Sequence, residues 1–241
     1  MKIRIKIMSL DFDNITLNEA VDIAIAYIKD KRKCRVVTPN SEIAYSCKYD
    51  ENLKNIINES QLILSDGVGV IIASKILKVP LKEKVAGIEF AQSLCDKLKD
   101  TSKTLFLYGG RPKIAKMAAE NLTITYPGLN IVGVCDGYVE ESIAIDKIIE
   151  SKADVLFVGL GSPKQEYFIS NNLDRLPSYM AIGIGGALDI FAGVSKRAPK
   201  IFVKLGLEWL YRLIKEPRRI GRMMRLPLYI LNIISYKFRK N

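Results

Sequence analysis

The residues that could act as acids or bases follow short apolar runs of strand length. The chain has no histidine, so any general base must be an Asp, Glu, Lys, Tyr or Cys side chain, and histidine-dependent nucleophiles and metal sites are excluded. Asp66 comes two residues after the apolar run 61–64, in a glycine-rich loop, where a carboxylate could take a proton from a ligand hydroxyl. Thr38 and Asn40, after the run 35–37, could orient such a ligand by hydrogen bonds. A simpler role for Asp66, in a turn or a helix cap, stays open.

Glycine-rich loops follow four further apolar runs. They are Gly109-Gly110-Arg111-Pro112, Cys135-Asp136-Gly137-Tyr138, Gly159-Leu160-Gly161-Ser162-Pro163-Lys164-Gln165-Glu166 and Gly185-Gly186-Ala187-Leu188-Asp189. Glycine lets a backbone approach a ligand closely, and a helix that begins after such a loop presents N–H groups to an anion. Each loop by itself is more often simple turn chemistry. Six such strand ends together predict a ligand cleft, and the loops at 109–112 and 159–163 suit a diphosphate.

The same loops exclude or weaken several enzyme classes. A Gly-x-x-x-x-Gly-Lys-Ser/Thr loop is absent, which argues against a nucleotide triphosphatase, and Gly159-x-Gly161 lacks the third glycine of a dinucleotide-binding loop. We expect the body to hold no Asp-x-Asp arrangement of the kind that typically binds a metal on a nucleotide-sugar diphosphate. We therefore expect no metal and no other cofactor, with a leaving diphosphate stabilised by cationic side chains and helix dipoles.

The elements that position these loops alternate between strand-length apolar runs and amphipathic segments of helical period. Expected strands are 35–37, 61–64, 104–108, 130–134, 154–158 and 180–184, and expected helices are 17–29, 68–78, 88–98, 112–123, 142–150 and 163–171. This alternation predicts an α/β fold with a Rossmann-like, mostly parallel sheet covered by helices on both faces. Residues 1–7 have the pattern of an edge strand. Ligands of such sheets bind at the carboxyl ends of the strands, where these loops lie.

The net charge of +11 is confined to residues 196–241. Residues 1–195 hold 24 Lys and Arg against 24 Asp and Glu, whereas 196–241 hold 13 against 2. The basic segment interleaves its cations with Trp, Leu, Ile and Met, which predicts a helical appendage on an anionic membrane surface after an α/β core of 1–195. A packed helix pair with incidental charge and a nucleic-acid-binding tail are alternatives, the latter disfavoured by the large apolar residues. The longest apolar stretch, 226–234, is far shorter than the ~20 residues of a spanning helix.

Taken in order, the motifs of the chain resemble those of the WecG/TagA/CpsF glycosyltransferases, glycosyltransferase family 26. The resemblance covers about residues 35–226. It is carried by Thr38-Pro39-Asn40, Asp66-Gly67-x-Gly69, Gly109-Gly110-x-Pro112, Gly159-x-Gly161-x-Pro163-x-Gln165-Glu166, Gly185-Gly186-x-x-Asp189, Phe191-x-Gly193-x-x-x-Arg197-Ala198-Pro199, Gly206-Leu207-Glu208-Trp209 and Glu216-Pro217-Arg218-Arg219.

The resemblance implies inverting transfer of a sugar from a UDP donor to a polyprenyl-diphosphate-linked acceptor at the inner face of the cytoplasmic membrane. The chain is most similar to the teichoic-acid branch, which moves N-acetylmannosamine from UDP-N-acetylmannosamine to O4 of N-acetylglucosamine on undecaprenyl diphosphate. Transfer of N-acetylmannosaminuronic acid or glucose, which the family also contains, stays open. The four cysteines show no paired spacing, so a peripheral protein of a reducing cytoplasm fits.

Within this reaction the residues take specific roles. Inversion needs a base on the acceptor hydroxyl, and Asp66 is our candidate, assisted by Thr38. Asn40 and Lys84 are expected to bind the acceptor, although lysine stands at 84 where we expect the arginine of an Arg-Val-x-Gly-x-Asp pattern, and lysine cannot make arginine's forked contact. The expected donor-binding residues are Gly109, Gly110, Arg111, Asp136, Tyr138, Gly161, Gln165, Gly185 and Asp189.

The appendage supplies cations that the body lacks. We expect it to fold over the cleft at the membrane and to bind the lipid or a diphosphate through Arg212, Arg218, Arg219, Arg222 and Arg225. Its apolar residues could also pair two subunits, so a homodimer that dissociates at the membrane is a further hypothesis. Two other classes stay open, a non-catalytic sugar-nucleotide-binding protein and a nucleic-acid binder, although we expect no nucleic-acid partner.

Overall fold

Six parallel strands form the centre of the structure, a computed structural model that describes residues 3–215, 217 and 220–240. Their order across the sheet is β4-β3-β8-β7-β5-β6, and every neighbouring pair is parallel. The strands are β3 (Cys34–Val37), β4 (Leu62–Ile63), β5 (Thr104–Gly109), β6 (Asn130–Cys135), β7 (Val155–Gly159) and β8 (Met180–Gly183). The predicted α/β class is confirmed, and each expected strand is present within two residues at either end.

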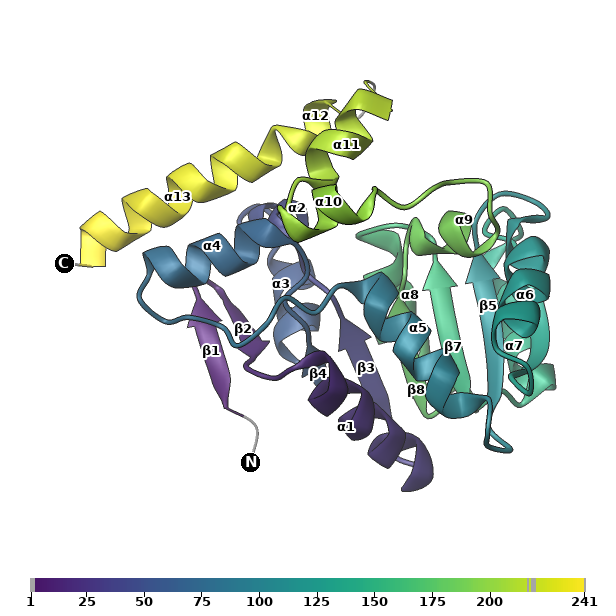
Figure 1. Cartoon of the computed structure of the whole chain (residues 1–241). Helices are drawn as coiled ribbons and strands as arrows, with labels where there is room; N and C mark the ends of the chain where they lie inside the picture. The colour runs from purple at the N-terminus through teal and green to yellow at the C-terminus, as the bar shows by residue number, and fades with distance from the viewer. Residues whose placement is uncertain (1–2, 216, 218–219, 241) are drawn as a thin grey trace.

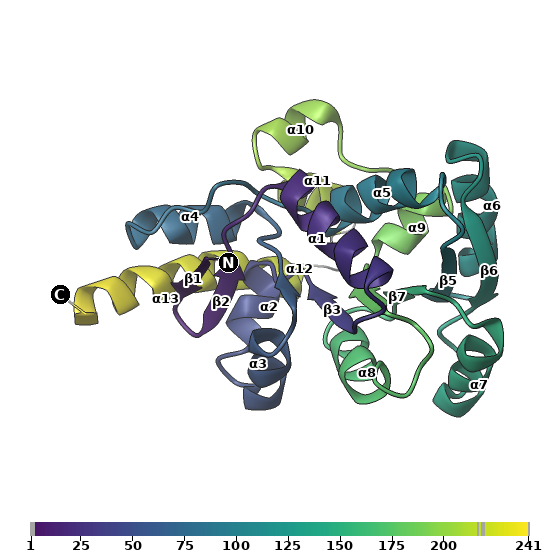
Figure 2. The same ribbon diagram turned by 90° about the horizontal axis from the view of Figure 1, so that it is seen from below.

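Helices cover both faces of this sheet, as Figure 2 shows. One face carries α1 (Leu17–Lys29), α5 (Gly87–Leu98), α6 (Ile114–Thr125) and α9 (Ala187–Phe191), and the other carries α7 (Glu141–Ser151) and α8 (Lys164–Asn172). The two-residue period of a strand explains this division. In β5, Leu105 and Leu107 pack with the first set of helices, whereas Phe106 and Tyr108 pack with the second.

A second, smaller core lies beside the β4 edge of the sheet (Figure 1). It is built from the antiparallel hairpin β1 (Arg4–Ile7) and β2 (Leu10–Asp13), from α2 (Ser41–Ser46), α3 (Glu51–Asn58) and α4 (Val68–Ile76), and from the last helix of the chain. The strand expected near the N-terminus therefore exists, but it pairs within this hairpin. Buried Asp13 attaches the hairpin to the sheet, because its carboxylate accepts from Ile63 N at 2.8 Å and from Arg4 Nε at 3.1 Å.

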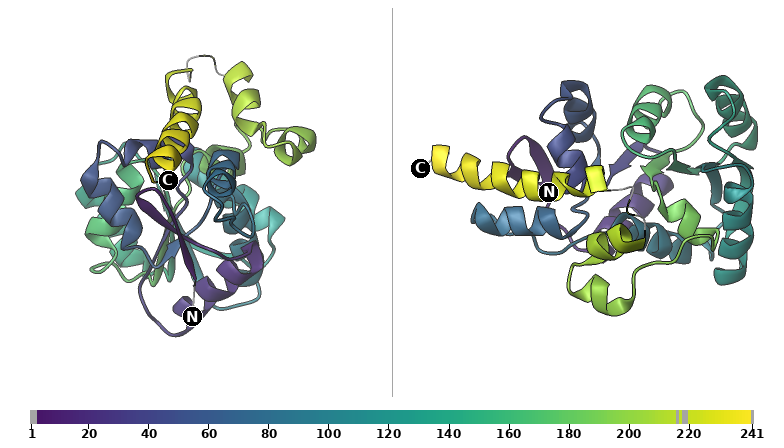
Figure 3. Two further views of the ribbon diagram at one scale, coloured as in Figure 1. Left: turned by 90° about the vertical axis from the view of Figure 1, so that its left-hand side faces the viewer. Right: turned by 90° about the horizontal axis from the view of Figure 1, so that it is seen from above.

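The C-terminal segment crosses above the carboxyl ends of the strands as α10 (Lys200–Lys204), α11 (Glu208–Lys215) and α12 (Ile220–Met223). It then continues as α13 (Arg225–Lys240), which runs alongside α4 (Figure 3). One side of α13 is packed, since Tyr229 and Ile233 are buried in the second core, and the predicted helical appendage is thus confirmed as a partly packed one. No helix among the described residues has the length and apolarity needed to cross a bilayer.

Candidate active site

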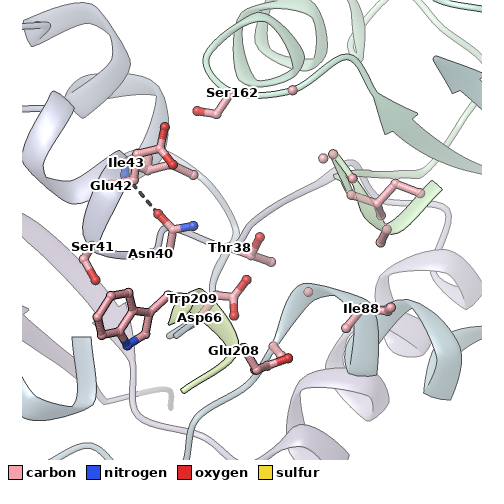
Figure 4. Close-up of a pocket in the computed structure, with 18 of the residues that line it drawn as sticks. Thr38, Asn40, Ser41, Glu42, Ile43, Asp66, Ile88, Ser162, Glu208 and Trp209 are labelled. Atoms are coloured by element: carbon pink, nitrogen blue, oxygen red, sulfur yellow. Dashed lines mark hydrogen bonds between the residues drawn. The ribbon is translucent and has the colours of Figure 1, made fainter. Parts of the chain in front are cut away.

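A pocket of about 290 Å³ opens at the carboxyl ends of β3, β4, β7 and β8 (Figure 4). Its walls come from the loops after these strands, from the beginning of α5, and from α11 and α13 of the appendage. Seven of the residues predicted for the site line this pocket: Thr38, Asn40, Asp66, Lys84, Gly161, Gln165 and Gly185. The beginning of α5 also lines the wall, and its N-cap Ala86 offers no capping side chain. The backbone N–H groups in the first turn of a helix favour anions.

Asp66 is held in the pocket by the backbone on both of its sides. Leu64 N donates to Val37 O at 2.8 Å, which extends the pairing of β3 with β4, and Val85 N donates to Ser65 O at 2.9 Å. After Asp66 the chain turns into α4 through Gly67, whose φ of 81° is accessible at little cost only to glycine. The strand end and this turn together place the carboxylate in the pocket.

Thr38 lies beside Asp66 in the close-up (Figure 4). Glycine at residue 87 leaves room for this side chain against the first turn of α5, since a Cβ there would lie in a tight contact, 3.1 Å from Thr38 Oγ1. A carboxylate next to a hydroxyl at the end of a parallel sheet can accept a proton from, and orient, a bound alcohol. This is the chemistry that the sequence predicted for the pair.

Asn40 has a structural task as well as its place in the pocket. It is the N-cap of α2, where its Oδ1 accepts from Ile43 N at 3.0 Å. Because the oxygen serves the helix, the amide nitrogen is the group that faces the pocket interior (Figure 4). Asn40 can therefore offer a donor, rather than an acceptor, to a bound sugar.

A network of ion pairs joins the appendage to the body at the rim of the pocket. Lys84 Nζ lies 3.2 Å from Glu208 Oε2 on α11, and Arg197 Nε lies 3.8 Å from the other carboxylate oxygen of Glu208. Arg197 also forms a salt bridge with Glu89 of α5. All four side chains are half-buried. Lys84 thus reaches the pocket as expected, but in this state its charge is balanced by a carboxylate of the appendage.

Of the predicted appendage arginines, Arg225 is the one whose side chain the structure describes. Its Nη1 donates to Ser46 Oγ at 2.9 Å and lies 3.6 Å from Glu42 Oε1, so it bridges α13 to α2 beside the pocket. Arg212 and Arg222 lie on α11 and α12, but their side chains are outside the described part of the structure, and Arg218 and Arg219 lie outside the described residues altogether. Their expected role therefore stays a prediction.

Six expected donor-binding residues do not line this pocket: Gly109, Gly110, Arg111, Asp136, Tyr138 and Asp189. The glycines at the end of β5 have a packing role, because a Cβ at Gly109 would lie 2.5 Å from the carbonyl of Gly159. Asp136 closes its own turn by accepting from Tyr138 N at 3.0 Å, and Tyr138 points into solvent. The carbonyl of Asp189 accepts from Val194 N and Ser195 N at 3.1 Å each, after α9.

Several pocket residues escaped the sequence reasoning. Ser41, Glu42 and Ser162 gave no signal beyond their neighbourhood to a motif, whereas Leu226 was visible only as an apolar residue of a basic segment. Glu208 and Trp209 both stand in the Gly206-Leu207-Glu208-Trp209 motif, which could have indicated a role. The appendage therefore contributes walls of the site as well as charge.

No cluster of three or more Cys, Asp or Glu side chains suited to a metal occurs among the described residues. The sequence does contain one Asp-x-Asp spacing, Asp11 and Asp13, which lies on β2. Asp13 is buried there and is bonded to Arg4 and to the backbone of Ile63. Neither aspartate lines the pocket.

The parallel sheet, with a pocket at the carboxyl ends of its strands, defines an α/β protein whose pocket lies where such folds bind their ligands. The family model described as "Glycosyl transferase WecG/TagA/CpsF family" matches residues 5–241. The chain belongs to this glycosyltransferase family, as its motifs indicated.

Three curated relatives carry the name N-acetylglucosaminyldiphosphoundecaprenol N-acetyl-beta-D-mannosaminyltransferase. The protein of Bacillus spizizenii is 34% identical over 233 residues, which is 96% of this chain and 91% of the relative. That of Bacillus subtilis is 34% identical over 236 residues, covering 97% and 92%. That of Staphylococcus aureus is 32% identical over 238 residues, covering 97% and 93%. The similarity thus includes both the body and the appendage.

Proposed function

We propose that this protein transfers N-acetylmannosamine from UDP-N-acetylmannosamine to O4 of the N-acetylglucosamine in N-acetylglucosaminyl-diphospho-undecaprenol, the β-1,4 step of wall teichoic acid linkage-unit synthesis. The relatives named N-acetylglucosaminyldiphosphoundecaprenol N-acetyl-beta-D-mannosaminyltransferase match almost the whole chain. The observation that carries the proposal is the position of Asp66 beside Thr38 in the pocket of this family fold.

In this reaction Asp66 takes the proton of the acceptor hydroxyl while that oxygen attacks the anomeric carbon. The bond from this carbon to the UDP oxygen breaks on the opposite face, so the configuration inverts and UDP leaves with the bonding electrons. Thr38 and the amide nitrogen of Asn40 orient the acceptor sugar. A general base of this kind typically contributes about 10²–10⁴ in rate.

Cations and backbone dipoles of the chain stabilise the negative charge on the leaving UDP. Lys84 lines the pocket and is assigned to the acceptor, while the beginning of α5 offers the leaving UDP its N–H groups and the positive end of a helix dipole. We include metal independence in the proposal: turnover should survive dialysis against EDTA with unchanged kcat. A loss that Mg²⁺ or Mn²⁺ restores would contradict this part.

We further propose that the appendage rests on the anionic inner face of the cell membrane. Its outward surface exposes large apolar side chains beside Lys237 and Arg239: Ile201, Leu205, Ile214, Ile220, Met224, Leu228, Leu231, Ile234 and Phe238. Apolar insertion and attraction of cations to anionic lipid act together in such surfaces. Because α11 and α13 also line the pocket, membrane contact would bring the polyprenyl acceptor to its mouth. In solution the same apolar surface would pair two subunits as a homodimer.

The decisive experiment is turnover of UDP-N-acetylmannosamine with a lipid-diphosphate N-acetylglucosamine analogue, read as UDP release and product mass. The wild type should transfer this sugar faster than glucose or N-acetylmannosaminuronic acid from their UDP donors. Asp66→Asn should lower kcat by at least about 10²-fold, because the amide cannot take the proton. Unchanged turnover by Asp66→Asn would refute the assigned base, and binding of duplex DNA in place of UDP-sugars would favour the nucleic-acid alternative.

A further inference from the structure

Gln165 is held at both ends of its side-chain amide. It lies in the first turn of α8, is only 5% exposed, and lines the pocket. Its Oε1 accepts from Gly185 N at 3.0 Å and its Nε2 donates to Glu166 Oε1 at 3.0 Å. A backbone N–H can only donate, so the amide atom that faces Gly185 must be the oxygen. The nitrogen therefore faces residue 166, which must provide an acceptor.

Glu166 is a charged residue type in a buried place. Glu166 is only 4% exposed, and its Oε2 has no hydrogen-bond partner in the described part of the structure. Burial raises the pKa of this carboxyl, while hydrogen bonding by Gln165 and Ser162 acts in the opposite direction. A buried carboxyl without full pairing costs free energy, and an apolar side chain would avoid this cost. Stability alone does not explain a glutamate here.

The backbone of β8 closes the remaining space around the amide of Gln165. A Cβ at Gly183 would lie 2.4 Å from Nε2, so the amide lies flat against the last residue of this strand. The loop that follows β8 lines the pocket from Gly183 to Ala187. Its Gly185 N–H is bonded to Gln165. One hydrogen-bonded chain thus leads from Glu166 through Gln165 to the pocket loop.

We propose that Glu166 is a positioning residue for the sugar-nucleotide donor. Its Oε1 fixes the Gln165 amide, and this amide in turn fixes the Gly185 loop, so that the donor contacts a pocket wall held in one arrangement. Glu166 itself does not line the pocket and acts only through Gln165. The inference rests on the proposed function, since its ligand is the UDP-sugar. An ordered wall contacts the donor equally before and during reaction, so its loss raises KM and leaves kcat unchanged.

Two substitutions of Glu166 distinguish the effect of its hydrogen-bond acceptor from the effect of its charge. Glu166→Leu suits the apolar surroundings but removes the acceptor, whereas Glu166→Gln keeps an oxygen that can accept from Gln165. Calorimetric titration with UDP-N-acetylmannosamine and with UDP, together with steady-state kinetics, should show Kd and KM for the donor raised about tenfold in Glu166→Leu, with kcat within about twofold. Glu166→Gln should stay within about twofold of the wild type in both constants. In a Gln165→Ala background, Glu166→Leu should have no further effect.

The outcomes distinguish this inference from the function on which it rests. Equal donor Kd in the wild type and in folded Glu166→Leu would overturn the inference alone, as would a loss in Glu166→Gln as large as that in Glu166→Leu. A lower kcat at unchanged KM in Glu166→Leu would indicate a structural role instead, and would also overturn it. If the wild type bound neither UDP nor UDP-N-acetylmannosamine, the proposed function would fail, and the inference with it.

Discussion

Substitution of Gly183 by alanine tests how closely the pocket wall is packed. The new Cβ would lie 2.4 Å from Gln165 Nε2, 2.6 Å from its Cδ and 2.8 Å from its Cγ. The backbone of Gly183 is not among those with positive φ, so alanine is tolerated there without backbone strain. The whole perturbation therefore falls on the side chain of Gln165.

The size of the effect follows from the bonds that Gln165 must give up. To reach an ordinary contact of 3.4 Å, its amide has to move by about 1 Å. Its two hydrogen bonds are both 3.0 Å long and point in different directions, so a shift of that size breaks or weakens both. At about 1 kcal/mol for each, the loss is about 2 kcal/mol. If this whole loss of free energy weakens donor binding, the Kd for the donor rises about 30-fold.

The assay is titration of UDP-N-acetylmannosamine into Gly183→Ala, with a thermal melt on the same samples. Gly133→Ala is the matched control, because a Cβ at Gly133 of β6 would lie 2.5 Å from Cε2 of Phe106 on β5, and Gly133 does not line the pocket. The control should lower Tm and leave the donor Kd unchanged. A Gly183→Ala protein that bound the donor like the wild type would refute the claim that Gln165 orders this wall.

Three further predictions concern charge and the appendage. Burial raises the pKa of Glu166 above its ordinary 4.5, so the folded state retains a proton that the unfolded state releases, and this contribution to stability declines as pH rises past 4.5. Glu166→Gln cannot titrate, so its Tm relative to wild type should increase from pH 4 to pH 8; a constant difference would contradict this. Lys84→Met and Glu208→Gln should each speed amide hydrogen exchange in α11, because each breaks the ion pair that holds this helix to the body. The free-energy effects of the two substitutions should be coupled by about 1 kcal/mol in the double variant, and purely additive effects would exclude the ion pair as the link between α11 and the body. Deletion of residues 196–241 should abolish turnover and also lower Tm, because Tyr229 and Ile233 leave the second core; full activity of the truncated protein on soluble analogues would refute the role of the appendage.

The strands and long helices were predictable because their signals are local. The expected helix 17–29 matches α1 at both ends, and at its beginning Thr16 and Glu19 form a capping box that is visible in the sequence. The expected helix 112–123 begins two residues late, since Lys113 adopts a left-handed conformation before it. Helices α2 and α3 were not expected, because six and eight residues hold too few turns for a clear period.

Local sequence signals also indicated which residues follow strands, but they did not indicate which of these residues line the pocket. Asp66 and Gln165 follow strands in polar loops, and so do Arg111 and Asp136, yet only the first two line the pocket. The loops differ in where their strands lie in the sheet, because β5 and β6 follow β7 on the side away from β3 and β4. Strand order depends on long-range packing, which a strand's own residues do not encode.

The sequence by itself determined the parallel α/β class, the absence of histidine chemistry, the concentration of positive charge in residues 196–241 and the presence of Asp66 at a strand end. These follow from periodicity and composition, which need no partner. Only the tertiary structure decided that Glu208 and Trp209 line the pocket, that Lys84 is paired with the appendage, and that Glu166 is buried behind Gln165. Each of these depends on contacts between residues far apart in the chain or on burial, and such contacts exist only once the core has packed.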